Sequence, residues 1–184
     1  DFCFYCSSDK IDGMAPVEGL KKIIKGDIFV DDKTLTQFSG DASLFSVRPE
    51  VVIAPKDSED IKNLVKFVLG EKRQHGTLSL TARSAGTDMT GGPLGDSIVL
   101  DFLKYFNWLG PISDDGVITS APGVYYRDFE KTTLTKDYFL PSYPASRELC
   151  AIGGLVNNNS GGEQSLIYGK TEKYVEELTV VLSD

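Results

Sequence analysis

An apolar stretch between two prolines constrains the fold more than any other feature of the sequence. Between Pro49 and Pro55, residues 51–54 are Val, Val, Ile and Ala, a run without alternation that predicts a strand covered on both faces. After Asp57, apolar residues recur at 61, 64, 65, 68 and 69, which is one face of a helix. A second strand is predicted at 77–82. This order predicts a parallel βαβ unit with a right-handed crossover.

The second strand leads into a glycine-rich stretch, residues 81–93, TARSAGTDMTGGP. Its glycines allow tight turns, and successive N–H groups in such turns form a concave site for anions. The interleaved Ser and Thr hydroxyls add donors, and Arg83 adds a positive charge. We therefore predict a cradle for a nucleotide pyrophosphate. An ordinary surface turn between strands is the alternative.

Two common phosphate motifs are excluded by spacing. Gly86 and Gly91 fit G-x-x-x-x-G, but Gly92 and Pro93 stand where a P-loop needs Lys and then Ser or Thr. A Rossmann turn requires G-x-G, and no two of the 18 glycines lie two residues apart. The sequence therefore argues against both metal-nucleotide binding of the P-loop type and a Rossmann site.

Further elements are predicted downstream. Residues 97–101 and 117–121 read as strands, with a turn at 114–116 before the second one, and residues 126–134 read as a helix. A second glycine-rich block follows at 144–169, where small side chains would let a flat aromatic ring lie close to the backbone. The residues alone predict an irregular glycine loop, and they leave open whether this loop contacts a ligand.

In order and spacing, these segments resemble the FAD-binding domain of flavoproteins of the vanillyl-alcohol oxidase and p-cresol methylhydroxylase type, which include D-lactate and glycolate dehydrogenases. The resemblance covers the strand at 49–55, the loop at 81–93, the strand at 97–101, the turn at 121–124 and the second block. It implies an α+β fold of two subdomains. A small parallel βαβ subdomain comes first, and part of a mixed or antiparallel subdomain follows, with FAD between them.

Carried over position by position, the resemblance implies two sets of FAD contacts. The pyrophosphate would lie on the first loop, against Arg83, Ser84, Ala85, Gly86, Thr87, Asp88, Thr90 and Gly91. The flavin and ribityl chain would lie on the second block, against Pro144, Ala145, Ser146, Gly153, Gly154, Asn159, Ser160 and Gly161. Some members of the family bind FAD covalently through a histidine, and Thr87 stands at that position. Other members use a cysteine as a second covalent link, and Cys150 lies closer to Gly153 than that cysteine does. The resemblance therefore implies non-covalent FAD.

The activity implied is oxidation of a 2-hydroxy acid, such as D-lactate or glycolate, by hydride transfer to the flavin. The run Asn157-Asn158-Asn159-Ser160-Gly161-Gly162 is similar to the D-lactate dehydrogenase branch. Two alternatives stay open: an enolpyruvyl-sugar reductase of cell-wall synthesis, which shares the fold and uses NADPH, and a non-catalytic scaffold. Because the relatives supply their catalytic groups after the position of Asp184, no catalytic residue is assigned here.

The expected organisation is an N-terminal tail and lead-in segment at 1–46, with a short helix at 17–24, followed by the FAD-binding domain at 47–184. The chain begins with Asp1 and ends in a predicted strand at 178–182, so we expect a fragment that is inactive alone. The apolar edge of that strand suggests self-association.

Charge and cysteine content limit the partners. The net charge is −8, with no Lys/Arg cluster, which argues against nucleic acid and leaves a small-molecule substrate. No apolar run reaches the roughly 20 residues that span a bilayer, so we expect a soluble, cytoplasmic protein. Cys3 and Cys6 form a lone C-x-x-C without further ligands, so no metal site is predicted. His75 is expected at a helix C-terminus in a non-catalytic role.

Overall fold

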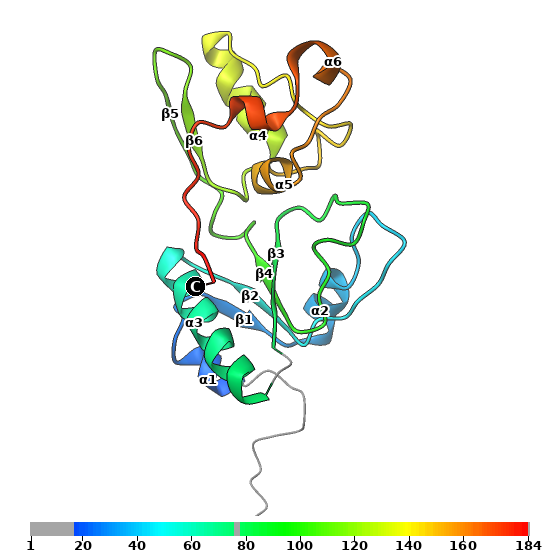
Figure 1. The fold of residues 1–184 in the computed structure, drawn as a ribbon, viewed down its shortest axis with the longest axis vertical. Coiled ribbons are helices and arrows are strands. Elements are labelled where there is room, and N and C mark those ends of the chain that lie inside the picture. The colour runs from blue at the N-terminus through cyan, green and yellow to red at the C-terminus, as the bar shows by residue number, and fades with distance from the viewer. Residues whose placement is uncertain (1–16, 76–77, 184) are drawn as a thin grey trace, which may run out of the picture.

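The computed structural model describes residues 17–75 and 78–183, and they form two subdomains (Figure 1). The first is built on a sheet in which β1 (Asp27–Phe29), β2 (Val51–Ala54), β4 (Ile98–Asp101) and β3 (Leu80–Arg83) lie in that order. Strands β2, β4 and β3 are parallel, and β1 is antiparallel to β2. Helix α3 (Ser58–His75) connects β2 to β3, with β4 inserted between them. The predicted parallel βαβ unit is confirmed.

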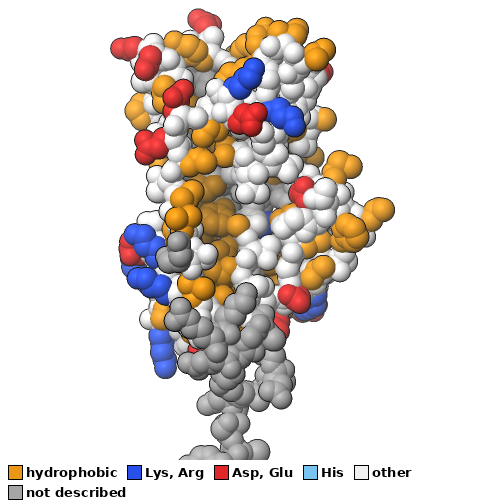
Figure 2. All heavy atoms as spheres, in the orientation of Figure 1, with side chains coloured by type: hydrophobic (Ala, Val, Ile, Leu, Met, Phe, Trp, Pro, Cys, Tyr) orange, Lys and Arg blue, Asp and Glu red, His pale blue; other side chains and the backbone are white. Residues whose placement is uncertain are grey.

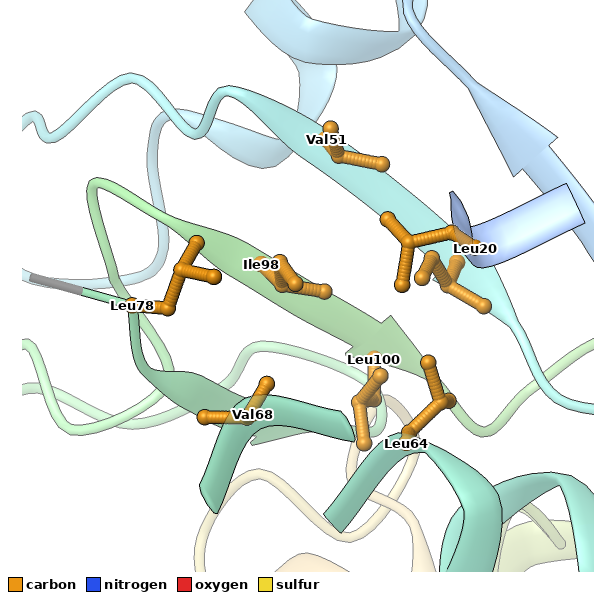
Figure 3. Packing of buried hydrophobic residues seen from close by; sticks show 8 residues of the cluster. Leu20, Val51, Leu64, Val68, Leu78, Ile98 and Leu100 are labelled. Carbon is orange, nitrogen blue, oxygen red and sulfur yellow. The ribbon is translucent and has the colours of Figure 1, made fainter. Parts of the chain in front are cut away.

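Both faces of this sheet are covered, which explains the continuous apolar run in β2. Because side chains alternate along a strand, Val51 and Ile53 face one side and Val52 the other. On the first side they pack with Ile98 and Leu100 against α3 and α1 (Val17–Lys21), as Figure 3 shows. On the other side, Val52 and Val99 pack against α2 (Asp32–Phe38). The core of the first subdomain is therefore two layers with the sheet between them.

The start of α3 is fixed by two carboxylates. Asp57 accepts the N–H of Asp60 at 3.0 Å, so it caps the helix. Asp60 is buried and accepts the N–H groups of Lys25, Gly26 and Lys56 at 2.8 to 2.9 Å. These bonds tie the turn after α1 to the helix that crosses over the sheet.

The second subdomain has its own core. The hairpin of β5 (Leu109–Ile112) and β6 (Ile118–Ser120) turns at Gly116, whose φ is +85°, and this confirms the predicted turn. The predicted helix at 126–134 is α4 (Tyr126–Thr133), followed by η1 (Leu134–Lys136). Then come α5 (Ile152–Asn157), α6 (Ser165–Tyr168) and η2 (Thr171–Tyr174). Fully buried Tyr126 donates its hydroxyl to the Leu140 carbonyl at 2.7 Å at the centre of this subdomain.

One predicted strand is wrong. Residues 178–182 are in no strand, and no described segment pairs with them. An extended segment becomes a strand only when a neighbour completes its ladder of backbone hydrogen bonds. After η2 this segment leaves the second subdomain and runs back toward the level of the first (Figure 1). Hydrophobic side chains gather along the middle of the same face, between the two subdomains (Figure 2).

Candidate functional site

The first glycine-rich loop begins where β3 ends, at the carboxyl end of the parallel strands. Gly86 has φ of +67° and Gly91 has φ of +85°, which side chains with a Cβ rarely adopt. The sequence requirement for glycine at these two turns is therefore confirmed. In addition, the site of a Cβ on Gly91 is 3.0 Å from Cδ2 of Phe45, which packs against the loop from the segment before β2.

The first half of this loop presents unused hydrogen-bond donors. Among the described residues, no protein atom accepts a hydrogen bond from the peptide N–H groups of residues 84–87. Backbone donors in folded proteins are almost always paired with protein, water or ligand. A run of four such groups in a turn that includes a positive φ is the arrangement that binds an anion.

Arg83 is turned into the protein. Its guanidinium donates to the Phe38 carbonyl at 3.3 Å and lies 5.1 Å from the centre of the Phe38 ring. Asp41 and Asp101 provide nearby negative charge, while burial lowers the pKa of Arg83. Burial raises the pKa of Asp101, and the Oδ2 atom of Asp41 is buried without a hydrogen bond. In this conformation Arg83 joins the loop to the end of α2.

Asp88 takes up donors in the second half of the loop. Its Oδ2 accepts the Thr90 hydroxyl at 2.7 Å, the Gly92 N–H at 2.8 Å and the Thr90 N–H at 3.1 Å. These bonds, the Thr90 hydroxyl first, lower the pKa of Asp88. The carboxylate is therefore ionised at neutral pH.

The second glycine-rich segment contains a cavity and a close backbone contact. Pro144 and Ala145 line a cavity of about 290 Å³ together with Tyr143, Arg147 and Glu163. Ser146 accepts the N–H groups of Leu149 and Cys150 through its carbonyl at 2.8 Å. The tight turn places Pro144 and Ala145 at the surface of the second core, next to buried Tyr143.

The two segments meet at the carbonyl of Pro122. It accepts the Gly153 N–H at 2.8 Å and the Ser84 hydroxyl at 3.1 Å. A Cβ on Gly153 would lie 2.6 Å from Pro122 Cβ, whereas a Cβ on Gly154 would meet nothing within 4 Å. Gly153 is therefore needed for close packing, and Gly154 leaves open space beside α5. The structure thus brings together Ser84 and Gly153, which lie 69 positions apart in the sequence.

Asn159, Ser160 and Gly161 are held by internal contacts. The Asn159 side chain donates to the Glu172 carboxylate at 2.8 Å and accepts the Glu172 N–H at 3.0 Å. Ser160 donates its N–H to Leu155 and accepts both donors of Thr171 through its carbonyl. The site of a Cβ on Gly161 is 2.5 Å from the Ser165 hydroxyl. These three residues shape the path of the chain after α5.

Sequence reasoning missed Pro122 and Phe38 as parts of this site. The turn at 121–124 was part of the resemblance, but nothing in it marks a carbonyl that joins two distant segments. A second cavity, of about 380 Å³, lies beside the start of α4 and is lined by none of the predicted residues; Leu103, Asn107, Leu109, Gly123, Val124, Tyr125 and Asp128 line it.

The remaining sequence predictions concern cysteines, a histidine, metal ions and the membrane. Cys3 and Cys6 lie outside the described residues, and so does the side chain of His75. Cys150 is buried, with 4% of its surface exposed. Within residues 17–75 and 78–183, no group of three His, Cys, Asp or Glu side chains could hold a metal ion. No helix in the described part of the chain is long and apolar enough to cross a membrane.

The names of several curated proteins of related sequence describe enzymes of 2-hydroxy acids. The glycolate oxidase subunit GlcD of Bacillus subtilis is 34% identical over 139 residues, 74% of this chain and 28% of that protein. A D-lactate dehydrogenase of Anaerostipes hadrus is 27% identical over 90% of this chain and 34% of its own length. A D-2-hydroxyglutarate dehydrogenase of Escherichia coli is 26% identical over 78% of this chain and 14% of that protein. The chain thus matches about a third or less of each relative.

Solved structures show the same fold. Alkyldihydroxyacetonephosphate synthase superposes with a TM-score of 0.69 at 20% identity, covering 85% of this chain and 30% of that one. The 6-hydroxy-D-nicotine oxidase of Arthrobacter nicotinovorans superposes with a TM-score of 0.64 at 22% identity, over 80% of this chain and 31% of that one. A family model described as "FAD binding domain" matches residues 49–184. The chain therefore belongs to the FAD-binding domain family of p-cresol methylhydroxylase-type flavoproteins, with the α+β fold that the sequence predicts.

Proposed function

We propose that this chain is the cofactor-binding part of a flavin-dependent dehydrogenase that oxidises a 2-hydroxy acid. The observation that carries the proposal is the run of N–H groups at residues 84–87, at the end of β3, that have no acceptor in the described part of the chain. These groups suit the pyrophosphate of FAD, because its negative oxygens accept hydrogen bonds from several backbone donors at once. The positive φ of Gly86 lets the backbone approach a phosphate without a Cβ in the way.

The flavin end of the cofactor would lie on the second segment. The two segments meet at Pro122, so a ligand bound to the 84–87 amides could extend toward α5 and the 144–146 turn. Gly154 offers an open surface there. When bound, the flavin would take up a hydride from the carbinol carbon of the substrate, and the hydroxyl proton would pass to a base, so that the substrate becomes a 2-oxo acid. This chain's own residues would bind the phosphates and orient the ring.

The cofactor would be held without a covalent bond. Thr87 has a hydroxyl that is a poor nucleophile at neutral pH, and the Cys150 thiol is buried against the Arg147 carbonyl with Sγ to O at 4.0 Å. Burial also raises the pKa of Cys150, which keeps the thiol protonated. Acid precipitation of the FAD-loaded protein should release all flavin into the supernatant, and a fluorescent pellet would contradict this assignment.

A 2-hydroxy acid is the proposed substrate because glycolate, D-lactate and D-2-hydroxyglutarate enzymes are among the relatives. No described feature favours the enolpyruvyl-sugar reductase or the scaffold. Dye reduction by the full-length protein with glycolate, D-lactate and D-2-hydroxyglutarate would identify the acid, and NADPH oxidation without any of them would favour the reductase. Self-association through residues 178–182 stays a prediction, although these residues form no strand.

A titration with three ligands tests the cofactor proposal. If the 84–87 amides hold the pyrophosphate, FAD should bind with quenching of flavin fluorescence, ADP should compete, and riboflavin should bind much more weakly because it has no phosphate. Riboflavin binding as tightly as FAD would contradict the proposed role of the first loop. If the protein does not bind FAD at all, the proposed function is overturned.

A further inference from the structure

The first loop already contains one anion of its own. The Asp88 carboxylate accepts three hydrogen bonds on a single oxygen, two from Thr90 and one from the Gly92 N–H. Several donors converging on one negative oxygen is also the way a loop holds a phosphate oxygen. Thr90 and the Gly92 N–H, which from the sequence look like free donors of a cradle, are therefore satisfied internally.

The two halves of the loop differ in the donors that they offer. The N–H groups of residues 84–87 have no acceptor among the described residues, whereas those of Thr90 and Gly92 donate to Asp88. A phosphate on Thr90 and Gly92 would have to expel a carboxylate and break three charge-assisted bonds. A phosphate on residues 84–87 breaks none. The geometry therefore favours the first half for the ligand.

We propose that Asp88 is a positioning residue for the cofactor: its carboxylate holds the 88–92 turn closed and leaves the 84–87 amides to receive the FAD pyrophosphate. This inference rests on the proposed function. It pairs Asp88 with Thr90, although the family resemblance implies that both contact the phosphates. It also explains how an acidic side chain is tolerated next to an anionic ligand, because its charge is already matched by local donors.

Two substitutions at Asp88 separate geometry from charge. Asp88→Asn keeps an oxygen that accepts the Thr90 and Gly92 N–H groups but removes the charge, whereas Asp88→Ala removes the acceptor. We expect Asp88→Ala to weaken FAD binding at least about tenfold, as loss of a charge-assisted brace would. Asp88→Asn should stay within about threefold of the wild type. Asp96→Asn is the matched control, since Asp96 is exposed nearby and its side chain makes no hydrogen bond to a described residue.

Either of two results would overturn the inference. Asp88→Ala binding FAD as tightly as the wild type, or tighter, would show that the carboxylate competes with the phosphates. Equal losses in Asp88→Ala and Asp88→Asn would show that the charge, and not the acceptor, matters. Thermal unfolding of each variant checks that the fold is retained.

Amide hydrogen exchange tests the brace, meaning the hydrogen bonds from Thr90 and Gly92 to the Asp88 carboxylate, without any cofactor. In the wild type the N–H groups of Thr90 and Gly92 should be protected, in Asp88→Asn largely protected, and in Asp88→Ala exposed to exchange. Unprotected amides in the wild type would overturn the brace. If the brace is present but the wild-type protein does not bind FAD, the proposed function has failed and the structural role of Asp88 stands.

Discussion

Gly86 and Gly91 in the first glycine-rich segment are required for a different physical reason from Gly153 and Gly162 in the second. In the first loop, Gly86 and Gly91 supply positive φ angles, and the N–H groups of residues 84–87 find no acceptor within residues 17–75 and 78–183. In the second segment, Gly153 and Gly162 allow close packing, because a Cβ on them would lie 2.6 Å from Pro122 Cβ and 2.2 Å from the Tyr143 carbonyl oxygen. The first loop is thus shaped to offer backbone donors, and the second to bring backbone and core together.

This comparison predicts that the second segment controls stability and the first controls binding. A close-packing glycine fails through steric overlap with neighbours that cannot move, so its replacement should destabilise the fold. A positive-φ glycine in an open loop fails through local strain and a changed direction of the donors. The predictions below test this division, beginning with the largest expected effect.

Gly153→Ala and its neighbour Gly154→Ala give the largest contrast. Both residues lie in α5, but only the Cβ at 153 would overlap Pro122. We expect Gly153→Ala to lower the free energy of unfolding by about 2 to 3 kcal/mol. Gly154→Ala should be neutral or stabilising by up to about 1 kcal/mol, because alanine favours the helix. Chemical denaturation measures both, and equal effects in the two variants would break the comparison.

Gly86→Val tests the first loop. The φ of +67° strains a β-branched residue, and the new Cβ would lie 2.5 Å from Nη2 of Arg83, a side chain that can move. We expect FAD affinity to fall at least about tenfold, with about 1 to 2 kcal/mol of lost stability. Gly70→Ala, at an exposed site with nothing within 4 Å, is the control. Full FAD affinity in Gly86→Val would show that the loop does not hold the cofactor.

Arg83 and Phe38 allow a test of how the first loop is anchored. The guanidinium lies over the Phe38 ring at 5.1 Å and donates to the Phe38 carbonyl. A double-mutant cycle of Arg83→Leu and Phe38→Leu should give a coupling of about 0.5 to 1 kcal/mol in the free energy of unfolding. A coupling near zero, together with a large loss of FAD affinity in Arg83→Leu alone, would place the guanidinium on the phosphates, as the sequence suggests.

The smallest expected effect is the pH dependence that Asp88 contributes. Its hydrogen bonds lower its pKa in the folded protein below the ordinary value of 3.8. The contribution to stability is therefore present above the unfolded pKa and is lost as the pH falls through the folded pKa. Asp88→Asn should lose less stability than the wild type between pH 5 and pH 2, to be measured by denaturation at each pH. Parallel curves would show that the carboxylate makes no such bonds.

Local patterns predicted the parts of the fold whose causes are local. Residues 51–54 are apolar without alternation because apolar layers cover both faces of this strand. Asp57 caps α3 by accepting the N–H of Asp60, three residues later. Strand β1 was missed because its three residues become a strand only by pairing with β2, far along the chain. Helix α5 was missed because two glycines oppose a helix, and contact with Pro122 overrides that preference.

In the site, too, the sequence predicted the features with local causes and missed those that depend on distant residues. Positive φ at Gly86 and Gly91 follows from residue type and turn chemistry, so the sequence indicates it. The partner of Arg83 is Phe38, 45 residues earlier in the chain. The partners of Asp88 depend on how the loop itself closes. A charged side chain in a phosphate-type motif therefore reads as a ligand from sequence, even when the fold gives it an internal partner.

Backbone NMR of the protein during an FAD titration tests the central claim most directly, because it reports each N–H group separately. The N–H signals of Ala85, Gly86 and Thr87 should move strongly as the pyrophosphate binds, since no described residue accepts a hydrogen bond from these donors. The signal of Gly162, whose N–H already donates to Ser165 at 2.8 Å, should move little. Unchanged signals at residues 85–87 in a protein that binds FAD would contradict the account.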